Sequence, residues 1–280
     1  MRPDGASTES RRNGVSPSGE IAFYSLGGEG PPALLLHGFG SDHLLWLANQ
    51  QAIAGVATVA ALDLPGHGDS SMDVGDGAVG SLAERVAALL DGKAMRKVHL
   101  IGHSLGGGVA LALAEARPDL VASLVLIAPA GLGRGVDGRF LAEFPRLATP
   151  EAAAALLRRL VVRPRLINKF MVGRALDQLE RPGARQALAQ IAEAIVQGEA
   201  SMARAADAAR RREVPRLVVW GAEDAINPYS EERVDQFGGE ILLVAEAGHL
   251  PQVEQPRLVN ERIGAFLARQ AARSGVEPDG

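Results

Sequence analysis

The sequence predicts an α/β fold in which helices flank a mostly parallel β-sheet and a helical cap is inserted between two strands. Two observations lead to this prediction. Short apolar runs bounded by Gly, Pro or Asp alternate with longer amphipathic stretches along most of the chain, which is typical of parallel strands covered by helices on both faces. The alternation stops once, between residues 134 and 212, where helical patterns follow one another without a strand.

Each short apolar run is expected to form one strand of the sheet. The expected strands are residues 21–25, 33–37, 58–63, 97–101, 123–128, 216–220 and 240–244. The longer stretches between them carry helical patterns of apolar residues. The expected helices are residues 43–54, 80–91, 104–117, 230–236 and 252–270. Because strand–helix–strand connections are right-handed, this order builds a sheet with helices on both faces.

The segment without strands is expected to form a cap. Its helical patterns cover residues 151–161, 166–179 and 185–198 and are separated by prolines. An insertion of this kind lies over the carboxyl edge of the strands, where ligands of open parallel sheets bind. The expected organisation is a core of residues 20–133 and 213–272, a cap of residues 134–212, and flexible tails of residues 1–19 and 273–280.

The composition excludes several classes of protein. A hydrophobic fraction of 47% and a charged fraction of 22% indicate a globular chain. No apolar run approaches the roughly eighteen residues that span a bilayer, and residues 1–19 lack the apolar region of a signal peptide. A cytoplasmic protein without a membrane partner is therefore expected. The absence of Cys excludes thiolate catalysis, and His and carboxylate spacing indicates neither a metal site nor another cofactor.

Charge is unevenly distributed along the chain. The net charge of −4 gives no reason to expect nucleic acid as a partner, yet residues 134–212 hold fourteen Arg and one Lys against eight acidic residues. The plain explanation is a set of solvated helix faces. The alternative is a basic surface that meets an anionic substrate or partner. The sequence predicts no oligomeric state.

The pentapeptide 102–106, Gly-His-Ser-Leu-Gly, is a candidate nucleophile turn. It follows the apolar strand 97–101 and precedes a helical stretch rich in Gly, Ala and Leu. Small residues around Ser104 permit a turn too sharp for larger side chains, so that its hydroxyl stands exposed at a helix N-terminus. By itself the motif fits a structural turn equally well. A base, an acid and an oxyanion hole elsewhere in the chain decide between the two.

His249 is the best candidate for the base that a serine hydroxyl needs. It lies in a loop after the last apolar strand and before the last helix, and in a parallel sheet that loop opens at the same edge as Ser104. His103, the neighbour on the turn, is expected to project away from the hydroxyl, and His37 is expected to order its own loop. The other histidines are His43, His67 and His99.

Asp224 is the best candidate for the carboxylate that fixes the tautomer of the base. The strand 216–220 runs into a glycine turn that ends in Glu223 and Asp224, and both acids fit the chemistry. Asp224 is preferred because it lies further into the turn, where it can reach over the sheet edge towards His249. The loop after the strand 123–128 offers no acid.

Two backbone amides are expected to form an oxyanion hole. The amide of Leu105 follows the nucleophile at a helix N-terminus, and the amide of Phe39 lies in a glycine-flanked loop after the strand 33–37. Four further residues are candidates for the substrate pocket, although burial in the core is the better default for the Trp. They are His37, Gly38, His103 and Trp46.

Five motifs in this order resemble the α/β-hydrolase superfamily over residues 20–270. They are residues 37–40 (HGFG), 63–70 (DLPGHGDS), 102–107 (GHSLGG), 220–224 (WGAED) and 248–249 (GH). The resemblance implies an α/β-hydrolase fold and the chain order nucleophile, acid, base, here Ser104, Asp224 and His249. A Ser at the turn separates the chain from the haloalkane dehalogenase branch, which has an Asp there.

A narrower resemblance concerns residues 121–133 and 137–140. These segments are similar to the hydrolase-type C-terminal domain of the acyltransferase component of acetoin dehydrogenase complexes. Subunits of that family also carry an N-terminal lipoyl domain. Only residues 1–20 precede the first expected strand here, so a lipoyl domain is expected to be absent.

The expected function is that of a serine hydrolase that cleaves carboxylic esters or thioesters of a small-molecule acyl substrate through an acyl-enzyme. An acyltransferase or a carbon–carbon bond hydrolase would use the same triad. Outside enzymes, the alternative is a non-catalytic binding module with this fold. The sequence predicts neither the acyl group nor the leaving group.

Overall fold

The computed structural model describes residues 21–273. The tail expected at residues 1–19, and residues 274–280 of the tail expected at 273–280, lie outside the described residues. Residue 273, which the prediction assigned to the second tail, ends the last helix.

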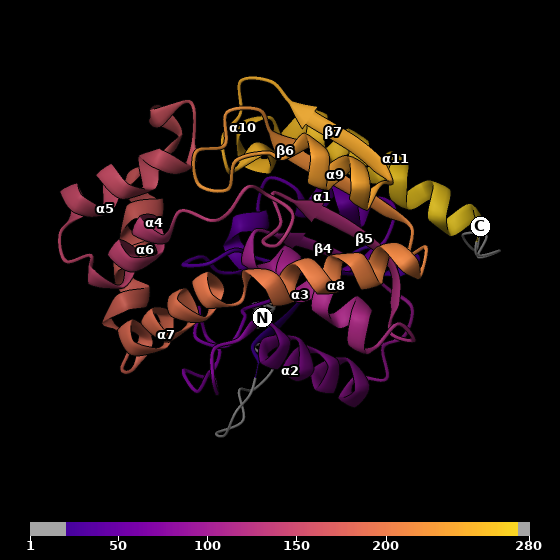
Figure 1. Ribbon diagram of the computed structural model, residues 1–280, viewed down its shortest axis with the longest axis horizontal. Coiled ribbons are helices and arrows are strands. Elements are labelled where there is room, and N and C mark those ends of the chain that lie inside the picture. The colour runs from indigo at the N-terminus through magenta and orange to yellow at the C-terminus, as the bar shows by residue number, and fades with distance from the viewer. Residues whose placement is uncertain (1–20, 274–280) are drawn as a thin grey trace, which may run out of the picture.

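The described chain forms one seven-stranded sheet, in which all strands but the first run parallel (Figure 1). The strands are β1 (Phe23–Gly27), β2 (Pro32–Leu36), β3 (Thr58–Leu62), β4 (Val98–His103), β5 (Val121–Ile127), β6 (Arg216–Gly221) and β7 (Glu240–Val244). Their spatial order is β1-β3-β2-β4-β5-β6-β7, and β1 pairs antiparallel with β3. The predicted α/β fold with a mostly parallel sheet is confirmed.

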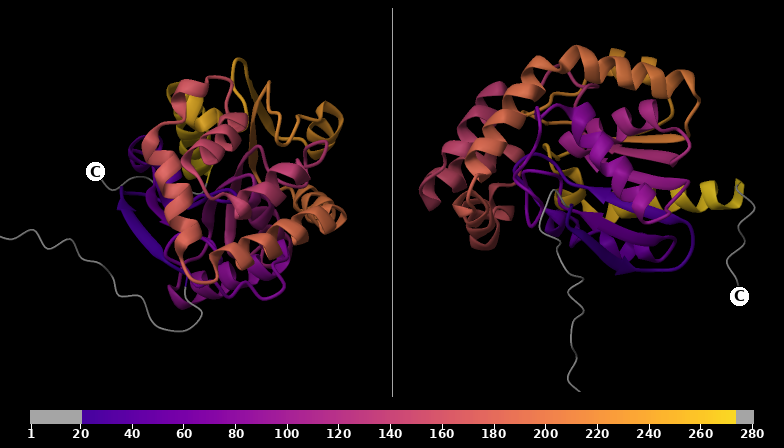
Figure 2. Two further views of the ribbon diagram at one scale, coloured as in Figure 1. Left: turned by 90° about the vertical axis from the view of Figure 1, so that its left-hand side faces the viewer. Right: turned by 90° about the horizontal axis from the view of Figure 1, so that it is seen from below.

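Helices cover both faces of this sheet (Figures 1 and 2). One face carries α2 (Val79–Gly92), α3 (Leu105–Ala116), α8 (Glu199–Arg211) and α9 (Glu231–Phe237), and the other carries α1 (Gln50–Ala54) and α11 (Pro256–Arg273). The strands are apolar on both sides: in β2, Leu34 and Leu36 pack towards the first face, and Ala33 and Leu35 towards the second. Burying one such leucine stabilises the fold by about 1.5–3 kcal/mol. Because both sides of the strands are buried, the sheet has one hydrophobic core on each face.

α2 shows why the sequence folds locally as it does. Leu82, Val86 and Leu90 recur every four residues and are fully buried, which places one apolar stripe of the helix against the sheet. The helix ends at Gly92, close to the residue that the sequence pattern predicted.

Every regular element between β5 and β6 is helical. These elements are α4 (Gly138–Glu143), α5 (Pro150–Leu157), α6 (Lys169–Glu180), α7 (Ala184–Gln197) and α8, with 3₁₀ turns at Phe144–Arg146, Arg158–Leu160 and Pro164–Leu166. Side-chain oxygens of Thr149 and Asn168 accept bonds from the first-turn amides of α5 and α6, which is why these helices begin there. Figure 1 shows α4 to α7 gathered beyond the ends to which the strand arrows point.

α8 differs from the other helices of this segment. The sequence pattern did not predict a helix over 199–211, and the prediction placed these residues in the cap. In the structure α8 packs along α3 over the sheet, with Met202, Ala205 and Ala209 buried (Figures 1 and 2). Its buried side chains are mostly alanines, whose small apolar area gives a weak hydrophobic pattern.

Two expected helices are interrupted. Residues 43–54 form a 3₁₀ helix (His43–Trp46) and the short α1, and residues 252–270 are divided between α10 (Pro251–Glu254) and α11. Pro256 explains the second interruption, because a proline lacks an N–H and disfavours helical dihedrals in the preceding residue. Gln255 accordingly has φ −131° and ψ 54°.

Two kinds of feature are absent from residues 21–273. No helix there combines the length and the apolar character needed to cross a membrane. No three His, Cys, Asp or Glu side chains there come together in a way that could hold a metal ion.

Candidate active site

Ser104 lies in a strained turn between β4 and α3. Its backbone has φ 51° and ψ −112°, and such a conformation costs about 1–3 kcal/mol. Close contacts require the glycines beside it. A Cβ on Gly102 would lie 2.4 Å from the carbonyl oxygen of Gly106, and a Cβ on Gly106 would lie 2.3 Å from that of Leu36. The turn presents Ser104 at the carboxyl edge of the sheet, where it lines a cavity.

His249 and Asp224 follow β7 and β6 and meet at the same edge. Nδ1 of His249 donates a hydrogen bond of 2.7 Å to Oδ2 of Asp224, and both side chains are buried. The other carboxylate oxygen accepts bonds of 2.9 Å from the amides of Ile226 and Asn227. Since a carboxylate only accepts, Nδ1 carries the proton and Nε2 is left to accept one. Glu223, the alternative acid, is exposed.

The two amides expected for the oxyanion hole come from α3 and from the loop after β2. Leu105 is the first residue of α3, so its N–H is one of the unpaired donors of a helix N-terminus. Phe39 lines the same cavity as Ser104. Gly38 allows its loop to come close, because a Cβ there would lie 2.5 Å from Nδ1 of His103. One amide from each of these two segments can then donate a hydrogen bond to a negatively charged oxygen.

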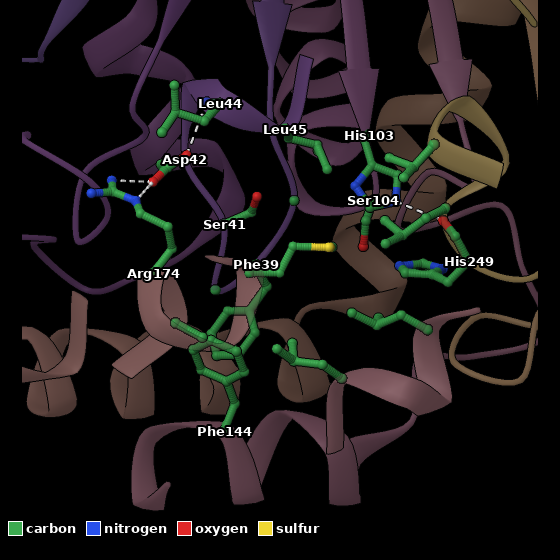
Figure 3. A pocket seen from close by; sticks show the side chains of 18 of the residues that line it. Phe39, Ser41, Asp42, Leu44, Leu45, His103, Ser104, Phe144, Arg174 and His249 are labelled. Carbon is green, nitrogen blue, oxygen red and sulfur yellow. Dashed lines mark hydrogen bonds and ion pairs between the residues drawn. The ribbon is translucent and has the colours of Figure 1, made fainter. Parts of the chain in front are cut away.

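His103 packs against the proposed base. The centroids of the His103 and His249 rings are 4.8 Å apart, and Nε2 of His103 donates to the carbonyl oxygen of His249 at 2.8 Å. The sequence predicted a side chain that projects away from the hydroxyl, whereas the ring lines the same cavity as Ser104 (Figure 3). Burial and the neighbouring His249 lower the pKa of His103 well below its usual range, so the ring is neutral and holds the His249 loop.

Of the four predicted pocket residues, Gly38 and His103 line the cavity, whereas His37 and Trp46 are not among the described residues that do. His37 is fully buried behind the loop: its Nδ1 donates to the carbonyl oxygen of Gly38 at 2.8 Å, and its Nε2 accepts from the amide of Leu64 at 2.9 Å. Trp46 is fully buried in the core. These two residues do not line the pocket; His37 orders its loop and Trp46 is buried in the core, as the alternatives stated for them in the sequence analysis had it.

The cavity has a volume of about 310 Å³ and lies between the core loops and the cap (Figure 3). Most of its wall is apolar, with Leu44 and Leu45 from the core and Phe140, Phe144 and Met171 from the cap. Such a wall accommodates the apolar part of a small ligand, while a few polar groups orient it.

Glu254, which the sequence analysis missed, joins the His249 loop to the cap. Its side chain is 5% exposed. Oε1 accepts from the amide of Gly248 at 2.6 Å, and Oε2 accepts from the amide of Val162 at 2.9 Å. The amide of His249 donates to the carbonyl oxygen of Leu160 at 2.8 Å. The loop that carries His249 is therefore bonded directly to the cap.

Asp42 and Arg174 form a second connection, between the loop after β2 and α6. Oδ1 of Asp42 caps the 3₁₀ turn by accepting from the amide of Leu44, and Oδ2 accepts from Nε and Nη2 of Arg174 (Figure 3). The two residues are 132 positions apart. The sequence held no signal for this pair, because a charge alone does not identify a distant partner.

A buried carboxylate, Asp63, fixes the loops behind the site. It accepts hydrogen bonds from the amide and Nδ1 of His43, from the amide of Asp69, and from the hydroxyl of Tyr24. Burial alone would raise the pKa of Asp63, but the hydrogen bond from His43 and its other partners lower it to about 2. The carboxylate is thus ionised and ties the loop after β3 to the start of the 3₁₀ turn.

The comparisons with known proteins identify the family. A model described as "Alpha/beta hydrolase family" matches residues 33–262. The chain belongs to this family. The α/β hydrolase is 40% identical over 250 residues to a protein of Pseudomonas putida named "Dihydrolipoyllysine-residue acetyltransferase component of acetoin cleaving system", and the match covers 89% of this chain and 67% of that relative. The resemblance predicted from the motifs, to the superfamily and to this component, is confirmed.

Two further comparisons concern esters and the fold. The α/β hydrolase is 31% identical over 233 residues to a "Pimeloyl-[acyl-carrier protein] methyl ester esterase" of Neisseria meningitidis serogroup B, covering 78% of this chain and 85% of the relative. Among solved structures, a meta-cleavage product hydrolase from Pseudomonas fluorescens IP01 superposes with a TM-score of 0.78 over 89% of this chain and 94% of that one. At 21% identity, this likeness concerns the fold alone.

Proposed function

We propose that this α/β hydrolase cleaves carboxylic esters or thioesters, with Ser104 as the nucleophile, His249 as the base and Asp224 as the acid that orients it. The observation that carries the proposal is the buried hydrogen bond of 2.7 Å from Nδ1 of His249 to Asp224, on the cavity that Ser104 and His249 both line. This bond leaves Nε2 of His249 free to take the serine proton.

The proposed reaction has two halves. In the first, Oγ of Ser104 attacks the acyl carbon while Nε2 of His249 removes its proton, and the amides of Phe39 and Leu105 hold the oxyanion. His249 then gives the proton to the departing alcohol or thiol, which leaves an acyl-enzyme. In the second half, His249 takes a proton from water, the hydroxide attacks the acyl carbon, and Ser104 is released with its proton restored.

A serine-directed probe and ester substrates test this proposal. We expect a fluorophosphonate to label the wild-type protein but not Ser104→Ala. The Ala variant should lose hydrolysis of p-nitrophenyl esters and acyl-CoA thioesters by on the order of 10⁴-fold or more, as is found when triad members are removed. A folded wild-type protein that stays unlabelled, or an Ala variant that still hydrolyses these substrates, would contradict the assignment of Ser104.

Acyl transfer to a thiol is the second candidate, because a relative with 40% identity carries the name of an acetyltransferase component. Transfer would use the same acyl-enzyme, with a thiol in place of water in the second half. The two are distinguished by adding a dithiol acceptor to a reaction with p-nitrophenyl acetate and measuring the products. Hydrolysis gives acetate at any acceptor concentration, whereas transfer gives a thioester that increases with the acceptor.

A further inference from the structure

One face of α6 forms a wall of the cavity. The lining residues Phe170, Met171, Arg174, Ala175 and Gln178 recur at the three- and four-residue spacing that places side chains on one side of a helix. The first half of this face is apolar. Arg174 and Gln178, which lie one turn apart, are the polar part of the face.

Gln178 is an unsatisfied polar group in this wall. Its side chain is 5% exposed, and its amide makes no hydrogen bond to any residue that the structure describes; its Nε2 is buried without an acceptor. Leaving such a group unpaired costs about 1–3 kcal/mol. Oε1 of Gln178 is not among the buried unpaired atoms. A half-turn of the amide, which exchanges the oxygen and the NH₂, brings the NH₂ to the accessible side, so that the side chain can donate to an acceptor in the cavity.

Arg174 adds a second donor next to Gln178. Its Nε and Nη2 donate to Asp42, while Nη1 has no acceptor among the described residues. Because the Arg174 guanidinium offsets the negative charge of the Asp42 carboxylate, the pair as a whole does not repel an oxygen ligand. Figure 3 shows Asp42 and Arg174 on the side of the cavity opposite Ser104 and His249.

We propose that Gln178 and Arg174 form a subsite for a hydrogen-bond acceptor at the far end of the substrate's acyl chain. The acceptor is a carbonyl or carboxylate oxygen, to which the Gln178 amide and the free Nη1 of Arg174 donate. The apolar wall between the two ends, with Leu45, Phe144 and Met171, covers the carbon chain. This inference rests on the proposed hydrolysis of an acyl substrate at Ser104.

Three p-nitrophenyl esters of equal chain length test the subsite in the wild-type protein. One acyl chain ends in a methyl group, one in a methyl ketone and one in a carboxylate. We expect kcat/KM to be higher for the ketone and the carboxylate than for the methyl end, mainly through a lower KM, because binding far from the reacting bond is shared by ground and transition states. Comparing the ketone with the carboxylate identifies which acceptor oxygen is preferred.

Gln178→Leu is the decisive variant, because it removes the amide at nearly constant volume. The ratio of kcat/KM for an acceptor-ended ester over the methyl-ended ester should fall roughly fivefold to tenfold, the value of one hydrogen bond. Asp177→Asn, on the exposed side of α6 and outside the cavity wall, should keep the wild-type ratio. The melting temperature should not fall in Gln178→Leu, because the substitution removes an unpaired buried amide.

Three results would overturn the subsite: a wild-type protein without a preference for acceptor-ended chains, a Gln178→Leu ratio equal to the wild-type ratio, or an equal fall for all three esters, which indicates a structural role. None of these results bears on the proposed function, since each compares rates of hydrolysis at Ser104. Absence of all ester hydrolysis would instead contradict the proposed function itself.

Discussion

At Ser104 the strained backbone is held by its neighbours. The amide of Ser104 donates to the carbonyl oxygen of Ile127 at 2.9 Å, and its own carbonyl oxygen accepts from the amides of Gly108 and Ala130 at 3.1 and 3.0 Å. The turn cannot relax without breaking bonds to α3, to β5 and to the residues after β5. A nucleophile fixed in this way has little freedom left to lose when it attacks a bound acyl group.

Asp224→Asn tests the residue that orients the base. An Asn amide can present its NH₂ to Nδ1 of His249, which favours the tautomer with the proton on Nε2, where it cannot accept from Ser104. We expect kcat for a p-nitrophenyl ester to fall by on the order of 10³–10⁴-fold with little change in KM. Glu223→Gln, at the exposed neighbouring acid, is the matched control and should keep its activity. Equal losses in both variants would mean that Asp224 is not the orienting acid.

Asp63→Asn tests the buried carboxylate behind the site. The folded-state pKa of Asp63 is about 2, below the ordinary value of 3.8. Ionisation of Asp63 therefore stabilises the fold above pH 3.8, and this stabilisation is lost as the pH falls through 2. The lowered pKa of Asp63 corresponds to a contribution of about 2 kcal/mol to the free energy of unfolding. Urea unfolding should show a gap of this size between wild type and variant at pH 6 that shrinks below pH 4; a gap that does not depend on pH would contradict the ionised Asp63.

At the residue scale, the sequence predicts positions that follow from chain order but not those that depend on distant contacts. Ser104, Asp224 and His249 could be picked out because each follows a strand whose carboxyl end meets the same sheet edge. Glu254 could not, since a buried acid that bonds backbone amides leaves no local pattern. For His37 and Trp46 the sequence left both a pocket position and an internal role open, because residue type and loop position do not specify which way a side chain packs.

At the element scale, the cap is joined to both loops that carry the proposed chemistry. Glu254 connects the His249 loop to residues 162 and 163, and Arg174 of α6 connects to Asp42 on the loop after β2. We therefore expect contacts between a substrate and the cap to be transmitted to His249 and to the loop after β2 through a few hydrogen bonds. A cap that shifts would move both loops.

Glu254→Gln tests the first of these connections. A Gln has a single acceptor oxygen, so its NH₂ must face either the amide of Gly248 or that of Val162. We expect the loss of one link to reduce the free energy of unfolding by about 1–3 kcal/mol and to speed hydrogen exchange at one of these two amides. Glu261→Gln, on an exposed position of α11, is the control. Unchanged exchange at both amides would show that Glu254 does not hold the cap.

The elements that the sequence predicted well are those with a strong hydrophobic pattern. The strands are short apolar runs with buried residues on both faces, and α2 carries an apolar stripe, so the local sequence pattern is enough to place them. The position of α8 depends instead on its packing against α3. The small side chains of its alanines allow the two helices to approach closely. The break before α11 depends on one residue, Pro256, which disfavours helical dihedrals in Gln255. A prediction based on the pattern of apolar residues does not include this effect.

At the scale of the whole molecule, the distribution of charge is the remaining feature. The chain carries a net charge of −4, whereas residues 134–212 hold fifteen basic and eight acidic residues. Several of these cations are used internally, as Arg159 is by Asp137 and Arg174 by Asp42. Arg158, Arg165 and Lys169 are exposed, and no partner is found for them among the described residues. They flank the cap segment that lines the cavity.

These unpaired cations predict how hydrolysis responds to salt. If they attract an anionic acyl thioester, kcat/KM for an acyl-CoA should fall as ionic strength rises from about 0.01 M to 0.15 M, where the Debye length shortens from about 30 to 8 Å. A neutral p-nitrophenyl ester should show a flat response.

Replacing Arg158, Arg165 and Lys169 by Gln should flatten the acyl-CoA response. The control replaces Arg210, Arg211 and Arg212, at the C-terminal end of α8 and away from α4 to α7 (Figure 1), and should leave the salt dependence intact. A flat wild-type response to salt would leave solvation as the role of the basic cap.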